Sequence, residues 1–463
     1  MSTRHSKAAE AYLKDDEVVD RHDRTFFGVR EKRDRMAHDL PEWEDLRDAA
    51  DRIKRHTVTH LADYLEQFEM NATRNGVKVH WAADADEYNR IVISILDDYH
   101  VEKVVKSKSM LTEECHLNQS LEEHGIEVVE TDLGERILQM MHLAPSHIVM
   151  PALHVHREQI GDCFREQIPG TKDDNDPTYL TQVAREHLRQ QFMEAGAGMT
   201  GANFGIASTG DVVVCTNEGN ADMSTSIPKL HIVSMGIEKL IPDYQSMAVF
   251  QRLLARCGTG QETTVYTSHF RGPRPGGEMH IVLVDNGRSC ILGNPEHWQT
   301  LKCMRCGACM NTCPVYRRSA GYSYTYFIPG PIGVNLGMLR DRSRYYDNVS
   351  ACSLCCSCDN VCPVKVDLST QIYRWRQSLD SDGHADSMKK FMSKGMKFLF
   401  SHPSLYTGTL KMARAMNWMP HWLTNCKMNP WAYGHEMMKF PKQSFHVQWK
   451  KLKKDDSGTL NEK

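Results

Sequence analysis

The chain has 463 residues, of which 41% are hydrophobic and 25% charged, a composition typical of a globular protein with two or three domains. No run approaches the roughly 18 apolar residues that a membrane span needs, which excludes a transmembrane protein. The first residues, Met1 to Lys7, lack the apolar segment of a secretory signal and predict a cytoplasmic location. In that reducing compartment the fifteen cysteines are expected to be free thiols and potential metal ligands.

The net charge of −3 conceals two oppositely charged halves. Residues 1–300 carry 32 Lys and Arg against 48 Asp and Glu, a net charge of −16, whereas residues 301–454 carry 23 against 8, a net charge of +15. The basic half lacks the glycine and aromatic signatures of RNA-binding modules, so no nucleic-acid partner is expected. The basic residues are interpreted as compensation for an anionic cofactor or as a docking surface for an acidic partner.

The predicted elements begin with a helical extension over residues 1–72, in which Pro41 precedes a helix over 42–54. From Gly76 to about Gly293 strands alternate with helices, which predicts an α/β domain with a mostly parallel sheet. The expected strands cover residues 77–81, 103–106, 126–130, 147–151, 202–207, 212–216, 231–234, 263–267 and 280–284. The expected helices cover residues 84–98, 111–124, 179–195 and 244–256.

Three polar segments of this domain are candidate sites. Residues 196–201 match GxGxxG, but a helix precedes them and a strand follows, the reverse of a dinucleotide-binding turn, so no nicotinamide or flavin is expected there. In the loop over residues 216–222, Glu218 is a candidate nucleophile or base and Asn220 a candidate to orient a carboxylate, with an ordinary turn as the equal alternative. Residues 106–109, Lys-Ser-Lys-Ser, are interpreted as a solvated turn, with an anion site as the alternative.

Eight cysteines form the strongest signal in the chain. They fall in two runs of the form C-x2-C-x2-C-x3-C-P, in which three thiolates of one loop bind an iron-sulfur cubane. In two-cluster proteins the fourth cysteine of each run binds the other cluster. The sequence therefore predicts two 4Fe-4S clusters, one bound by Cys303, Cys306, Cys309 and Cys362 and the other by Cys352, Cys355, Cys358 and Cys313.

A pair of zinc sites is the alternative metal assignment. Zinc needs four thiolates from C-x2–4-C pairs separated by a longer loop, a pattern that two complete quartets fit poorly. Cys356 stands where the first run has Gly307 and is expected to lie beside the cluster without binding it. The isolated cysteines are interpreted as buried small hydrophobic side chains; they are Cys115, Cys163, Cys215, Cys257, Cys290 and Cys426.

Beyond Pro363 the chain is predicted to be helical. An amphipathic basic helix is indicated by apolar residues at helical spacing with lysines between them, namely Met388, Phe391, Met392 and Met396. Its Met-rich face is interpreted as packed on a core, with a docking or membrane-surface role left open. The rest to Trp449 is expected to be an irregular helical segment that wraps the protein, and residues 450–463 a frayed tail.

Four expected segments follow from these patterns: an N-terminal helical extension (1–72), the α/β domain (73–293), a mostly helical dicluster ferredoxin-like domain (294–385) and a Met- and Trp-rich C-terminal segment (386–463).

Four short motifs stand out besides the cysteine runs: VKSKSM at 105–110, ETDLGE at 130–135, TNEGN at 216–220 and GIEK at 236–239. With the doubled cysteine run and the C-terminal segment they resemble the lactate-utilisation protein B family, the iron-sulfur component of a three-protein L-lactate oxidation system. The resemblance implies a first domain of the LUD type, similar in fold to sugar-phosphate isomerases and CoA transferases, and a dicluster ferredoxin module held by the eight cysteines. It also implies two partners, an LUD-type subunit and a subunit with cysteine-rich domains. Fold similarity does not transfer isomerase or transferase chemistry.

The expected function is electron transfer in the oxidation of L-lactate to pyruvate, with two neighbouring clusters accepting electrons one at a time. The chain is expected to be a subunit of an L-lactate-oxidising complex, and the sequence names no electron acceptor. One alternative is an iron-sulfur subunit that passes electrons from another 2-hydroxy acid, such as glycolate, to a membrane quinone system, for which peripheral membrane contact stays open. A second alternative is a redox sensor with a ligand-binding first domain.

Overall fold

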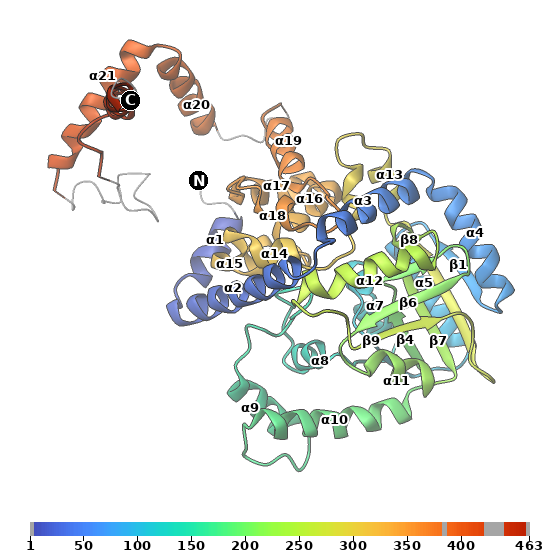
Figure 1. The fold of residues 1–463 in the computed structure, drawn as a ribbon. Helices are drawn as coiled ribbons and strands as arrows, with labels where there is room; N and C mark the ends of the chain where they lie inside the picture. Colours follow the sequence, from blue (N-terminus) through green and yellow to red (C-terminus); the bar gives the residue numbers. More distant parts are fainter. Residues whose placement is uncertain (1–3, 382–386, 421–438, 460–463) are drawn as a thin grey trace. The chain divides into compact units, whose positions relative to one another are not determined.

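The computed structural model describes residues 4–381, 387–420 and 439–459 (Figure 1). The chain divides into two units, Met1–Leu379 and Asp380–Lys463. The domain boundaries expected at residues 72/73, 293/294 and 385/386 stay predictions.

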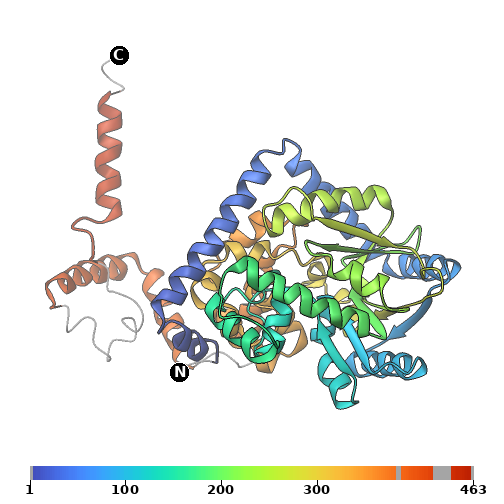
Figure 2. The same cartoon turned by 90° about the horizontal axis from the view of Figure 1, so that it is seen from below.

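Four helices open the first unit: α1 (Arg4–Tyr12), α2 (Asp16–His38), α3 (Trp43–Thr59) and α4 (Leu61–Arg74). Asp15 caps α2 by accepting a hydrogen bond from the Val18 amide, which satisfies one of the free donors of the first turn. Phe26 of α2 and Trp43 at the start of α3 are buried in the largest hydrophobic core of the protein. The helical extension is thereby attached to the rest of the unit by a shared core. Figure 2 shows these helices beside the rest of the unit from a second direction.

The main sheet has six strands in the order β1-β10-β7-β4-β2-β3, and every neighbouring pair is parallel. Its strands are β1 (Lys78–Ala82), β2 (Lys103–Lys106), β3 (Glu127–Glu130), β4 (Ala197–Gly201), β7 (Leu230–Gly236) and β10 (Glu278–Val284). A second sheet has the order β8-β5-β6-β9, with β5 (Phe204–Ile206), β6 (Asp211–Thr216), β8 (Leu240–Ile241) and β9 (Tyr266–Phe270). The predicted α/β class with a mostly parallel sheet is confirmed.

The helices of this region are α5 (Ala85–Asp98), α6 (Met110–Glu114), α7 (Leu117–Glu123), α8 (Leu133–Met140), α9 (Arg157–Gln167), α10 (Pro177–Glu194), α11 (Asn220–Ser226), η1 (Ile237–Lys239), α12 (Tyr244–Gly258) and α13 (Arg288–Leu292). The single helix predicted over 111–124 is wrong, because His116 adopts a left-handed conformation with φ of 55° and separates α6 from α7. The strand predicted over 263–267 lies slightly later, at Tyr266–Phe270.

The strand predicted over 147–151 is also wrong, because these residues form a loop. The apolar side chains of Ile148 and Val149 pack in the hydrophobic core that contains the first cysteine run, and not within a sheet. His147 is buried there, and its Nδ1 accepts hydrogen bonds of 3.0 Å from the amides of Val149 and Met150.

Strand β4 was not predicted, because its residues fall inside the GxGxxG pattern. Gly198 is required in this strand, since a Cβ there would lie 1.6 Å from the carbonyl oxygen of Ser224.

The cysteine-rich part is predominantly helical, with η2 (Trp298–Lys302), α14 (Ala308–Thr312), α15 (Pro314–Ser319), η3 (Gly321–Tyr324), α16 (Gly330–Arg340), α17 (Arg342–Ala351), α18 (Ser357–Val361) and α19 (Leu368–Ser381). Trp375 of α19 is buried and stacks on His297, with ring centroids 3.7 Å apart. The helical character predicted for this part is confirmed.

The second unit contains α20 (Ser387–Phe400), α21 (Pro403–Ala415), η4 (Met416–Trp418) and α23 (Phe445–Thr459). The helical character expected for the C-terminal segment is therefore confirmed, whereas the frayed tail is wrong for residues 450–459, which belong to α23; residues 421–438 and 460–463 lie outside the described part. Phe391, Met392 and Met396 of α20 are exposed, so that face is not packed on a core of this unit; the side chain of Met388 lies outside the described residues. Within the described ranges no helix is long and apolar enough to cross a membrane.

Candidate iron-sulfur and ligand site

The first cysteine run forms a tight loop between η2 and α15. Arg305 and Gly307 have φ values of 60° and 82°, and these left-handed residues fold the chain back on itself. The Arg305 amide donates to Cys303 Sγ at 3.4 Å, and the Ala308 amide donates to Cys306. Hydrogen bonds from amides to sulfur favour thiolates and tune the potential of a bound cluster.

The second run repeats this backbone. Leu354 and Cys356 have φ values of 54° and 60°, at the positions of Arg305 and Gly307. The Leu354 amide donates to Cys352 Sγ at 3.3 Å, and the exposed Cys356 donates its thiol to the Leu354 carbonyl at 3.5 Å. Cys356 therefore occupies the turn position that glycine fills in the first run.

The fourth cysteine of each run lies near the thiols of the other run. Burial raises the pKa of Cys362 to about 12, and the neighbouring Cys306 and Cys303 add to the rise. Burial likewise raises the pKa of Cys313 to about 11, with a further contribution from Cys352. Each fourth cysteine is therefore close enough to a thiol of the other run for that thiol to raise its pKa.

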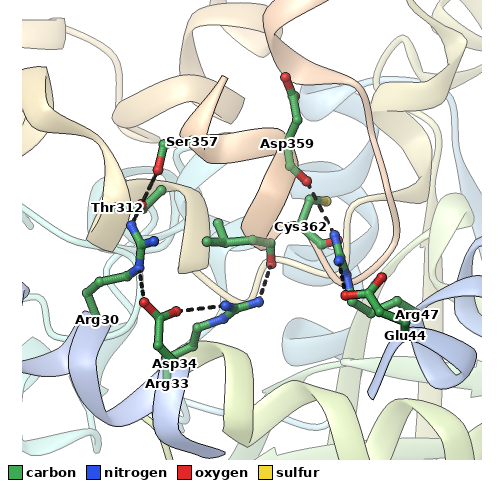
Figure 3. Close-up of polar contacts among 10 residues, drawn as sticks. Arg30, Arg33, Asp34, Glu44, Arg47, Thr312, Ser357, Asp359 and Cys362 are labelled. Carbon is green, nitrogen blue, oxygen red and sulfur yellow. Dashed lines mark hydrogen bonds and ion pairs between the residues drawn. The ribbon is translucent and has the colours of Figure 1, made fainter. Parts of the chain in front are cut away.

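Arginines of the N-terminal helices bind the ends of both cysteine runs (Figure 3). Arg47 of α3 is 7% exposed and donates from Nη2 and Nε to the Cys362 carbonyl at 2.9 and 3.2 Å. Arg33 of α2 donates to the Val361 carbonyl at 3.4 Å. These contacts hold the loop that presents Cys362.

Arg30 of α2 acts on both runs at once, because it donates to the hydroxyls of Thr312 and Ser357, which are hydrogen-bonded to each other at 2.5 Å. Asp34 pairs with Arg30 at 2.6 Å and with Arg33 at 2.8 Å and fixes both guanidinium groups, as Figure 3 shows.

Acidic residues of α2 and α3 also pair with basic residues around the cysteines, in the pairs Asp23–Arg317, Asp20–Arg318, Asp51–Lys302 and Asp48–Lys365. Part of the negative charge of the first half is therefore paired with positive charge of the second half within the chain.

A cavity of about 310 Å³ opens at the carboxyl ends of the parallel strands. The chain passes from β2 outward to β3 but then returns to β4 on the other side of β2, which makes the β2–β4 boundary the switch point of the sheet. Ligands of open α/β sheets bind in the crevice at such a point. Ser109 after β2 and Gly201 at the end of β4 line the cavity, and a Cβ at Gly201 would lie 2.9 Å from the Ser109 hydroxyl.

Lys106 and Lys108, interpreted from the sequence as a turn or an anion site, have separate environments. Lys106 is 1% exposed and forms an ion pair of 2.7 Å with Glu130, which raises its pKa against the effect of burial. Lys108 lines the cavity and pairs with Glu135 at 3.4 Å. The solvated turn is wrong for Lys106, whose ammonium supports the sheet edge, whereas Lys108 faces the cavity.

Glu218 and Asn220 both line the cavity. Burial raises the pKa of Glu218 to about 7, and the nearby Asp132 adds to the rise. Its Oε2 accepts a hydrogen bond of 3.2 Å from the Leu133 amide. Asn220 is 8% exposed and accepts from the Thr216 hydroxyl at 3.4 Å. A carboxyl group with a pKa near neutrality is suited to exchanging protons with a ligand.

The first cysteine run also contributes to the wall of this cavity. Arg305 and Cys306 line it together with Glu238, Lys239 and Arg288. A cavity of the α/β domain therefore borders a predicted cluster ligand.

Comparisons with known proteins agree with this architecture. The LUD domain family matches residues 65–288, and the 4Fe-4S dicluster domain family matches residues 299–366. Lactate utilization protein B of Shouchella clausii is 42% identical over 81% of this chain and 80% of its own length, and that of Oceanobacillus iheyensis is 40% identical over 92% and 91%. The chain belongs to the lactate utilisation protein B family.

The Escherichia coli relative named uncharacterized electron transport protein YkgF is 41% identical over 83% of this chain and 82% of its own length. A crystal structure of a DUF162 family protein from Deinococcus radiodurans covers 48% of this chain at 12% identity, with a TM-score of 0.29, too low to carry an argument. The dicluster domain makes this member of the lactate utilisation protein B family an iron-sulfur protein.

The interpretation of the isolated cysteines as buried side chains is confirmed for Cys115, Cys163 and Cys257 and wrong for Cys290, which is exposed, while Cys426 lies outside the described residues. Sequence reasoning missed one contact of Cys257. Interpreted as a small hydrophobic side chain, it lies at the C-terminal end of α12, is fully buried and is hydrogen-bonded to Cys306, whose pKa it raises. No spacing signal links the two, because Cys257 lies 46 residues before the first run's first cysteine in the sequence. Among the residues that the structure describes, no three His, Cys, Asp or Glu side chains are grouped to hold a single metal ion.

Proposed function

We propose that this protein carries electrons in the oxidation of L-lactate to pyruvate through two 4Fe-4S clusters. The observation that carries the proposal is the pair of matching cysteine loops in a member of the lactate utilisation protein B family. Bound clusters supply one-electron acceptance and release. Lactate oxidation yields two electrons, so two neighbouring one-electron sites are matched to it.

The proposed ligand sets are crossed. Cys303, Cys306, Cys309 and Cys362 bind one cluster, and Cys352, Cys355, Cys358 and Cys313 bind the other. The donor set fits iron-sulfur clusters because thiolates on two such loops are the ligands these clusters take. In the free chain burial raises the pKa of thiols such as Cys309 and Cys358. Such thiols stay protonated in the free chain, whereas metal coordination deprotonates them outright.

The surroundings of the thiols also fit. Amides at Arg305, Leu354 and Val366 donate to Cys303, Cys352 and Cys362 at 3.3 to 3.4 Å, so they stabilise negative charge on sulfur. Arg47 holds the loop that presents Cys362. These contacts orient the thiolates before any electron arrives.

The proposed partners are an LUD-type subunit and a subunit with cysteine-rich domains, in the cytoplasm, within an L-lactate-oxidising complex. Glu218 is the proposed proton acceptor in the cavity, because its pKa of about 7 lets it exchange a proton near neutral pH.

Anaerobic purification with these partners, followed by EPR spectroscopy after addition of L-lactate, tests the proposal. Two cubanes correspond to about eight iron atoms per chain, and L-lactate is expected to reduce them. Zinc in place of iron, or one cubane per chain, would contradict the cluster assignment. Spectra that respond to glycolate and not to L-lactate would move the function to another 2-hydroxy acid.

A further inference from the structure

We propose that the cavity at the carboxyl edge of the main sheet binds a small 2-hydroxy or 2-oxo monocarboxylate directly against the cluster loop that contains Cys306. This inference rests on the proposed function and deepens it, because it gives this chain its own binding site for the substrate or product. It concerns binding, and no bond is made or broken in it.

The cavity has separate basic and acidic groups. Lys239, Arg288 and Arg305 line the cavity together with Glu238, which pairs with Arg288 at 2.5 Å. Glu218 lines it together with Asp132 and Lys108, and its carboxylate accepts a hydrogen bond from the Leu133 amide. A hydroxy acid is complementary to this arrangement. Its carboxylate can pair with the basic residues, and its hydroxyl can donate a hydrogen bond to the acidic ones.

The basic group has an excess of positive charge. Arg288 is fully engaged, with ion pairs of 2.5 Å to Glu238 and 2.9 Å to Glu114. Burial lowers the pKa of Lys239 despite the nearby Glu238, and within the described part of the chain the structure shows no ion pair that would hold its ammonium, so an incoming anion favours the charged form. Nη1 of Arg305 is buried without a hydrogen-bond partner. Two of the three cations therefore have donors available for an incoming anion.

A second donor without a partner also lines the cavity. Ser107 is 4% exposed, and its hydroxyl has no hydrogen-bond partner. A buried polar group left unsatisfied costs about 1–3 kcal/mol, so its presence in a cavity wall marks a place where a ligand or water completes the bond. Ile148 and Ile328 supply apolar wall for a short alkyl group.

The charge on the cavity favours a monoanion over phosphate. Asp132 and Glu218 repel a second negative charge, while Lys239 and Arg305 need only one carboxylate between them. The volume of about 310 Å³ lies at the lower end of the range for small-molecule sites, which is roughly 300–1,000 Å³, and leaves room for a short acid with bridging waters.

Because Cys306 forms part of the wall, an anion in the cavity must affect the electrostatics of the neighbouring cluster. It stabilises the oxidised cluster, which carries one negative charge fewer than the reduced one, so binding lowers the midpoint potential. If the oxidised protein binds the anion tenfold more tightly than the reduced protein, the shift for a one-electron couple is about 59 mV.

Equilibrium dialysis of labelled pyruvate and L-lactate against the anaerobically purified full chain, without partners, tests the proposal. Saturable binding is expected, with inorganic phosphate binding at least tenfold more weakly. Lys239→Gln should weaken pyruvate binding at least tenfold and abolish the pyruvate-dependent shift in potential. Ser107→Ala should weaken it about two- to tenfold. Lys172→Gln, at an exposed lysine outside the cavity, is the matched control and should change neither.

No saturable binding, or binding equal in Lys239→Gln and the control, would overturn the inference. Phosphate binding as tight as pyruvate binding would overturn the assignment to monocarboxylates. If Lys239→Gln loses iron, pyruvate binding by Ser107→Ala is the test instead, and binding equal to that of the control would overturn the inference. One outcome separates this inference from the proposed function. If L-lactate reduces the clusters when the partners are present but does not bind this chain alone, the proposed function stands and only this inference is overturned.

Discussion

The two cysteine loops have the same backbone but different surroundings. The first loop is covered by the α/β domain, where Cys306 contacts Cys257 and borders the cavity. The second loop is open, with Cys355 and Cys356 exposed. Identical local sequence patterns thus make two sites of unlike solvent access, a property that tunes cluster potential.

The largest effect is expected from pairs of cysteine substitutions that test crossed ligation. The double variant Cys303→Ser with Cys362→Ser should lose about four iron atoms per chain, because both residues bind one cluster. Each of the two single variants should lose the same amount. Cys303→Ser with Cys313→Ser should lose about eight, because it damages both. Iron and sulfide analysis of anaerobic preparations measures this. The reverse outcome would show that each loop binds its own cluster.

Arg47→Ala should have the next largest effect. It removes a buried guanidinium that makes two hydrogen bonds to the Cys362 carbonyl, which predicts a loss of about 3 kcal/mol in the free energy of unfolding. Chemical denaturation of the holoprotein measures the change. Arg35→Ala, at an exposed position of the neighbouring helix α2, should stay within about 0.5 kcal/mol, and an equal loss in both variants would contradict a specific role for Arg47.

Exchanging the turn residues of the two loops should have a smaller effect. Gly307→Cys is expected to cost about 1–2 kcal/mol, since φ is 82° and the new Cβ would lie 3.2 Å from Val149 Cγ2. Cys356→Gly should be neutral or stabilise by up to about 1 kcal/mol. Thermal denaturation and iron analysis compare them. Loss of iron from Cys356→Gly would make Cys356 a ligand.

The smallest expected effect is a change in one potential. Cys257→Ala removes a thiol that can donate to Cys306, so the midpoint potential of the first-loop cluster should fall by roughly 20–60 mV. The other cluster should keep its potential, because Cys257 is hydrogen-bonded to Cys306, a proposed ligand of the first cluster. Redox titration followed by EPR separates the two. Equal shifts in both clusters would indicate a general change in structure.

Sequence patterns predicted those parts of the fold that depend on local order. Strand β2 begins and ends where expected, and Asp84 caps α5 by accepting from the Glu87 amide. The loop at residues 147–151 was mistaken for a strand because burial against the first cysteine run and burial within a sheet both select apolar side chains. Periodicity over five residues cannot separate these two environments.

The sequence by itself determined the eight thiols, their spacing and the alternation of strands and helices, because each depends on residues close together in the chain. Only the tertiary structure decided that Arg47 reaches the Cys362 carbonyl, that Cys257 meets Cys306, and that Ser107 and Lys239 face one cavity. These contacts join residues separated by 49 to several hundred positions, and they form only when burial of a shared core brings the segments together.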